Sequence, residues 1–189
     1  MNVTETSLAW LLEPEDPSVQ YFTLTDLFDL SPDSPEARQA RNQKWTGAHW
    51  RLVSLVELGL PAGDPHAIRA AEQVLAWLWS EAHRKAIKSL QGLVRRCASQ
   101  EGNALAVCSR LGMAGDPRCR GLAESLVAWQ WPDGGWNCDK REDARHSSFY
   151  ESLAPLWGLL EYHRITGDKD CLAAARRCGE FFLRHRLFR

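Results

Sequence analysis

Three residues with metal-binding side chains lie in the second half of the chain. Cys97 follows two arginines, whereas Cys138 and His146 belong to segment 131–146, WPDGGWNCDKREDARH. Thiolate sulfur and imidazole nitrogen are preferred Zn²⁺ ligands, with carboxylates as further donors. We therefore predict Cys97, Cys138 and His146 as metal ligands and zinc as the ion. The alternative is that the cysteines are buried free thiols and His146 caps the loop.

The same segment offers three acids for proton transfer, Asp133, Asp139 and Asp143. A carboxyl group with a raised pKa can protonate an alkene, and aromatic rings can stabilise the resulting cation. Each acid also has a structural interpretation. Asp133 lies in P-D-G-G, which is typical of a turn, and the other two belong to a charged, solvated stretch.

Tryptophan is frequent in this chain, with nine residues in 189. Each ring buries a large area and needs a partner for its N–H group. The pattern predicts either a core rich in large rings or a cavity lined by them. The candidate substrate-binding residues are Trp50, Asn103, Trp136, His146 and Trp157.

Charge and hydropathy limit the class of partner. The 23 basic and 24 acidic side chains give a net charge of −1, which excludes bulk electrostatic binding to nucleic acid or an anionic membrane. No run of about 20 apolar residues predicts a transmembrane helix. The first residues lack the basic region of a signal peptide, so six reduced cysteines in a cytoplasmic protein are expected.

A recurring Gly-Asp dipeptide indicates which helices would position the candidate ligands and acids. Gly63-Asp64, Gly115-Asp116 and Gly167-Asp168 follow one another at intervals of 52 residues, and the first two continue with proline. Glycine favours the left-handed conformation that ends a helix, aspartate caps the next helix, and proline is tolerated at its first position. The repeat predicts helical hairpins.

The resulting map is a single all-α domain over 1–189. It has an N-terminal extension over 1–43, with short helices near 18–30 and 34–43, and helical-hairpin repeats over 44–189. No segment has the alternation of a strand. The basic connector 84–98 is expected to be partly helical and 131–146 to be a long loop. The predicted helices of the repeats are 47–60, 65–82, 103–112, 117–130, 147–165 and 169–185.

Because hairpins alternate direction, the loops that enter every second helix gather along one edge. Segments 44–49, 95–103 and 131–147 are such loops. This arrangement would bring the candidate ligands and acids together.

One motif resembles a known superfamily. The stretch Gln130–Trp136, QWPDGGW, resembles the Q-x(n)-G-x-W motif of squalene and hopene cyclases and the PDGGW form of protein prenyltransferase β subunits. Lys44–Trp50, KWTGAHW, is similar to a K-Y-x-G-T-x-W segment of bacterial relatives. The resemblance covers residues 44–185 and implies an α/α toroid, in which inner and outer helices alternate. In such a fold, Gln130 would bond backbone groups at helix ends and Trp136 would pack on the adjoining hairpin.

The chain also departs from that superfamily. It lacks the D-x-D-D motif of protonating cyclases and the D-D-x-x-D motif of ionising terpene synthases. It lacks the D-x-C spacing of the prenyltransferase zinc site, since Cys138 precedes Asp139. Its three clear hairpins are fewer than a closed toroid needs, so an incomplete arc is expected.

The resemblance implies a squalene-cyclase- or prenyltransferase-like protein with a groove for an apolar, isoprenoid-type group. The alternative is a non-catalytic binding or assembly module of the same fold, which would bind an apolar ligand, a peptide or another subunit. Self-association through the open edge of the repeats is then expected.

Overall fold

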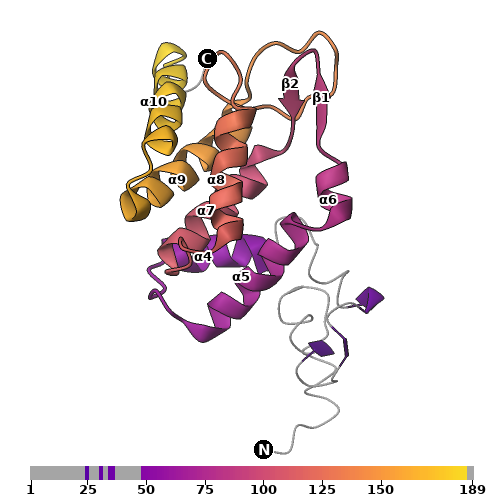
Figure 1. Cartoon of the computed structure of the whole chain (residues 1–189), viewed down its shortest axis with the longest axis vertical. Helices are drawn as coiled ribbons and strands as arrows, with labels where there is room; N and C mark the ends of the chain where they lie inside the picture. Colours follow the sequence, from indigo (N-terminus) through magenta and orange to yellow (C-terminus); the bar gives the residue numbers. More distant parts are fainter. Residues whose placement is uncertain (1–23, 26–29, 32–33, 37–47, 187–189) are drawn as a thin grey trace, which may run out of the picture. The chain divides into compact units, whose positions relative to one another are not determined.

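The computed structural model describes residues 24–25, 30–31, 34–36 and 48–186, and these are mostly helical (Figure 1). The chain divides into two units, Met1–Gly59 and Leu60–Arg189. Most of the predicted helices over 18–30 and 34–43 lies outside the described residues, and only 35 and 36 of the second are seen as α-helical.

The first unit contains helix α4, Ala48–Glu57. Its buried side chains are Ala48, Leu52 and Val56, which are spaced by four residues and therefore share one face of the helix. Trp50, a predicted substrate-binding residue, lies on this helix and is half-buried.

The second unit contains six helices and one hairpin among its described residues. In chain order they are α5 (Pro65–Leu78), α6 (Glu81–Lys85), β1 (Lys88–Leu90), β2 (Leu93–Arg95), α7 (Ala98–Arg110), α8 (Pro117–Trp129), α9 (Phe149–Thr166) and α10 (Lys169–Arg184). None of the described helices combines the length and apolar character needed to cross a membrane.

The three aspartates of the repeat are helix N-caps, as predicted. Asp64 Oδ1 accepts hydrogen bonds from the backbone of His66 and Ala67 at 3.0 and 2.8 Å. Asp116 caps α8 and Asp168 caps α10 in the same way, through bonds of 2.7 and 2.9 Å. Each side chain satisfies donors that the first helical turn would otherwise leave unpaired.

The glycines of the repeat are less uniform than predicted. Gly63 and Gly167 have the left-handed conformation, with φ of 85° and 75°. Gly115 does not, because α7 ends earlier and Gly112 takes that conformation with φ of 88°. The second helix stop therefore lies three residues before the dipeptide.

The prediction of no strands is wrong for the connector 84–98. Helix α6 ends at Lys85, and β1 then pairs with β2 as an antiparallel hairpin. Gln91 and Gly92 form its two-residue turn, with φ of 52° and 77°. Positive φ at both positions gives the turn type whose twist matches that of paired strands.

Helix α7 is the centre of the second unit. Eleven of its 13 residues are buried, and it packs mainly against α9. The contact is close because Gly102 of α7 faces the backbone of Ala154 and Pro155, and Gly158 of α9 faces the backbone of Gly102. Helix α8 contacts α7, α9 and α10, while α10 also packs on α9. The predicted helical class therefore holds apart from the hairpin, and the toroid stays a prediction.

Candidate functional site

Two cysteines and one glutamate bring their ligand atoms together at the start of α7 and α9. The Sγ atoms of Cys97 and Cys138 and a carboxylate oxygen of Glu151 lie within 4.8 Å of one another. Cys97 is the N-cap residue of α7 but makes no capping bond, so its thiol is available for another partner. Below, these three residues are called the thiol–carboxylate cluster.

Backbone pairing brings Cys138 to the cluster from the loop after α8. Asn137 bridges to Arg95 at the end of β2, and its carbonyl accepts a 3.1 Å bond from the Arg96 N–H. On the other side, the carbonyl of Trp136 accepts a 2.8 Å bond from the N–H of Ser148, the N-cap of α9. Residues 136–138 are thus held between the segments that lead into α7 and α9.

Glu151 enters the cluster because its carboxylate turns toward α7. One oxygen accepts a 3.1 Å bond from the Ser99 N–H, and the other lies 3.7 Å from Cys138 Sγ. Ser148 caps α9 by accepting a 3.4 Å bond from the Glu151 N–H. The reciprocal half of a capping box is absent because the Ser148 N–H bonds to Trp136 instead.

The donor chemistry of the cluster fits zinc. Two thiols and one carboxyl group provide three ligands, and a catalytic zinc site keeps its fourth position for water or substrate. Burial raises the pKa of the Cys138 thiol to about 12, and the neighbouring Cys97 thiol and Glu151 carboxylate act in the same direction. A bound dication reverses that effect, because a coordinating thiol is deprotonated.

His146, the third predicted metal ligand, is not part of the cluster. Its side chain is exposed, while its backbone carbonyl accepts a 2.8 Å bond from Asn137 Nδ2. Glu151 is the third member of the cluster, in place of the predicted histidine.

The three predicted acids have other surroundings. Asp133 accepts bonds from the backbone N–H and hydroxyl group of Ser147 at 2.8 and 2.5 Å, which close the loop 131–146. Asp139 pairs with Arg141 at 2.7 Å, and the arginine lowers the pKa of that carboxyl group. Asp143 is exposed.

The motif residues Gln130 and Trp136 connect helices. The Gln130 amide donates 2.8 Å bonds to the carbonyls of Gly134 and Ala174, so the end of α8 is tied to α10. Trp136 is 1% exposed and donates through Nε1 to the Leu126 carbonyl at 2.9 Å. Both therefore serve packing in this chain. Of the other predicted substrate residues, Asn103 is buried on α7 and Trp157 is half-buried on α9.

A buried charged group near the cluster was missed by the sequence analysis. Glu101 is 2% exposed, and its Oε1 atom accepts a 2.7 Å bond from Arg96 Nε. The same oxygen lies 3.2 Å from Nε2 of His83, whose pKa is lowered to about 4 by burial and then by Arg96. The only sequence signal for this buried group was the glutamate itself. Helix α7 begins five residues before the predicted start, which places Glu101 in its first turn.

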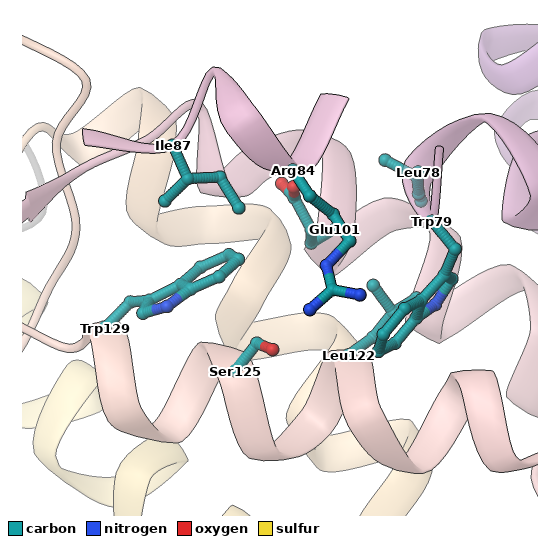
Figure 2. A pocket seen from close by; sticks show the side chains of 8 residues that line it. All are labelled: Leu78, Trp79, Arg84, Ile87, Glu101, Leu122, Ser125 and Trp129. Atoms are coloured by element: carbon teal, nitrogen blue, oxygen red, sulfur yellow. The ribbon is translucent and has the colours of Figure 1, made fainter. Parts of the chain in front are cut away.

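Glu101 also lines a pocket of about 370 Å³, shown in Figure 2. The walls come from α5 and the residue that follows it, from α6 and the segment that follows it, and from α7 and α8. Among them, the ring of Trp79 lies over Gly121 of α8, where an added Cβ atom would meet Trp79 Cζ2 at 2.5 Å. The lining residues, hereafter the tryptophan pocket, are Leu78, Trp79, Arg84, Ile87, Glu101, Leu122, Ser125 and Trp129. None of the predicted acids belongs to this set.

No protein-family model, curated protein or solved structure matches this chain.

Proposed function

We propose that this chain is a zinc-binding protein of the squalene-cyclase- and prenyltransferase-like kind, which accepts an apolar, isoprenoid-type group. Cys97, Cys138 and Glu151 would hold the metal. The observation that supports this most is the convergence of two thiols and a carboxylate within 4.8 Å from three separate segments.

The arrangement of the last four helices supports a toroid-like arc. The pairs α7–α8 and α9–α10 are each joined by a segment that ends in a capping aspartate. The first helices of the two pairs pack together closely, and α8 contacts α10. An α/α toroid has the same relation between inner and outer helices. Because this rests on fold-level analogy, the chemistry must come from the cluster.

The surroundings of the cluster suit a metal ligand set. The Ser99 N–H orients Glu151, which fixes one carboxylate oxygen and leaves the other toward Cys138. Such outer hydrogen bonds are typical of metal ligands. When bound, zinc would lower the pKa of a thiol or water at its open position and so supply a nucleophile at neutral pH.

An apolar surface lies on the helix that carries Glu151. Tyr150 and Leu153 are 55% and 62% exposed, and Trp157 is half-buried. Their spacing, three and then four residues, sets them on one face of α9. A hydrocarbon chain bound there would lie along the helix that contributes a metal ligand.

Metal analysis tests this proposal. The full chain purified without chelator is expected to contain one equivalent of zinc, and Co²⁺ substitution is expected to give the absorption of a thiolate complex. Cys97→Ala, Cys138→Ala and Glu151→Gln should each lower the metal affinity at least about 10-fold. Cys171→Ala is the matched control, since Cys171 is a buried cysteine of α10 outside the cluster. Wild-type protein that folds and binds neither ion would refute the proposal.

The second candidate function is a non-catalytic assembly module, favoured by the same exposed side chains on α9. Here Tyr150 and Leu153 would contact another copy of the chain or a partner protein. Leu153→Lys is expected to dissociate such an assembly, as measured by analytical ultracentrifugation. The zinc content, measured by metal analysis, should stay unchanged. If wild-type protein is monomeric and holds zinc, the first candidate stands alone.

A further inference from the structure

The tryptophan pocket shares no residue with the thiol–carboxylate cluster. Its walls are largely apolar, with the rings of Trp79 and Trp129 on opposite sides and the aliphatic side chains of Leu78, Ile87 and Leu122 (Figure 2). Apolar walls with a few polar groups are typical of a small-molecule site. The question is which polar group of a ligand the pocket can satisfy.

One oxygen of Glu101 has no hydrogen-bond partner in the described part of the chain. Oε1 bonds to Arg96 and His83, whereas Oε2 is buried and has no hydrogen-bond partner among the residues that the structure describes. An unpaired buried oxygen is costly, and few are tolerated in folded proteins. Glu101 lines the pocket, but Oε2 itself has no exposed surface, so a ligand would bond to this oxygen only when the carboxyl group turns toward the pocket.

Arg84 provides a second polar group. Its guanidinium carbon lies 5.3 Å from the centre of the Trp79 ring, and Figure 2 shows the group inside the pocket, in front of Glu101. Arginine can only donate hydrogen bonds. A ligand must therefore offer an acceptor to Arg84 and a hydrogen-bond partner to Glu101 Oε2.

Charge excludes most ionic ligands. The Glu101 carboxylate is already paired with Arg96, and Arg84, which has no carboxylate partner among the described residues, adds a positive charge to the lining, so a cation gains little. An anion would meet Arg84 favourably but would lie against the buried Glu101 oxygen, where like charges repel at low dielectric. A neutral polar group avoids both costs.

We infer that the tryptophan pocket binds a small apolar alcohol, whose hydroxyl group bonds to Glu101 and Arg84 and whose hydrocarbon part lies between Trp79 and Trp129. A hydroxyl group donates one hydrogen bond and accepts others, so it suits both side chains at once. It also suits either protonation state of Glu101, whose pKa is raised by burial. At about 30 Å³ for each water-sized unit, the pocket volume corresponds to roughly 12 non-hydrogen atoms.

Isothermal titration of the full chain with named compounds tests this inference, independently of zinc. The alcohols are 2-naphthol and 1-decanol, which distinguish a planar from a flexible hydrocarbon part, and naphthalene lacks the hydroxyl group. We expect at least one alcohol to bind, and 2-naphthol to bind about 10-fold more tightly than naphthalene, as one hydrogen bond to a charged group would give.

Two variants of α8 complete the experiment. Ser125→Phe fills the pocket and should weaken binding of the alcohol at least about 10-fold, whereas Ala128→Phe adds the same ring at an exposed position of the same helix and should change it less than about twofold. Neither substitution alters the buried Glu101, and circular dichroism checks that both variants fold. Lack of binding by both alcohols, equal affinity for 2-naphthol and naphthalene, or full binding by Ser125→Phe would each overturn the inference. Since no cluster residue is changed, a negative result here leaves the zinc proposal standing.

Discussion

The carboxylate of Glu151, in the first turn of α9, accepts a 3.1 Å hydrogen bond from the backbone N–H of Ser99, in the first turn of α7. A helix N-terminus has unpaired N–H groups and a partial positive charge, so a carboxylate there is stabilising. This single contact ties the two central helices together and directs the other oxygen of Glu151 toward Cys138.

Glu151→Gln should therefore weaken the fold as well as the metal site. Loss of a charge-assisted bond at a helix N-terminus is expected to lower the free energy of unfolding by about 1 to 2 kcal/mol, measured by urea denaturation in the presence of chelator. Glu180→Gln, on the exposed side of α10, is the control and should stay within about 0.5 kcal/mol of wild type. Equal effects of the two substitutions would show that the Ser99 contact contributes nothing to stability.

The two glycines at the contact of α7 and α9, Gly102 and Gly158, should tolerate no side chain. A Cβ atom on Gly102 or Gly158 would collide with the backbone of the facing helix, so Gly102→Ala should lower the unfolding free energy by more than about 3 kcal/mol. Gly179→Ala is the matched control in α10, where an added Cβ atom meets nothing within 4 Å. There the better helix propensity of alanine should stabilise by up to about 1 kcal/mol. Thermal unfolding of a stable Gly102→Ala variant near the wild-type midpoint would contradict the close contact.

Replacing a capping aspartate should lower the free energy of unfolding more than replacing an exposed acid. Asp116 caps α8 and also pairs with Arg118 at 2.6 Å, and the arginine holds the pKa of that carboxyl group below its ordinary value. Asp116→Ala is expected to cost about 1 to 2 kcal/mol, against less than about 0.5 kcal/mol for Asp143→Ala in the exposed loop. Chemical denaturation of both variants gives the comparison. A cost for Asp116→Ala as small as that for Asp143→Ala would mean that the cap is dispensable.

Acid should destabilise the protein through His83. Its pKa falls from 6.5 to about 4 in the folded state, because it is buried among Trp77, Arg96 and Glu101. The unfolded chain then binds more protons between pH 6.5 and 4, so this group makes stability fall as pH falls through that window. Glu101 acts in the opposite sense, since burial raises its pKa.

The His83 contribution is isolated by comparison with His83→Gln. The unfolding free energy of the variant, measured by urea denaturation from pH 7 to pH 5, should decline less than that of wild type. His185→Gln, on an exposed position, serves as the control. Identical slopes for wild type and His83→Gln would show that His83 does not titrate on unfolding.

Most of the helices could be predicted from the local sequence. The Gly-Asp repeat predicted three N-caps, and all three aspartates make the expected bonds. Caps depend on residues within one turn of each other, so their signal is complete in the sequence. The β1–β2 hairpin was missed because it is short and its Gln91-Gly92 turn is an uncommon signal, and the start of α7 was missed because its first turn is rich in polar residues.

The sites depended on the fold. Cys97 and Cys138 could be predicted as ligands from the sequence, because cysteine is a ligand type wherever it occurs, but the third predicted ligand was the neighbouring His146 and not Glu151. Only the packing of α7 on α9 brings Glu151 to Cys138, since its carboxylate is drawn to the N–H groups at the start of α7. The tryptophan pocket likewise joins residues from 78 to 129 that share no motif. Side-chain type and local caps were readable from the chain alone, whereas contacts between distant segments were decided by how the helices pack.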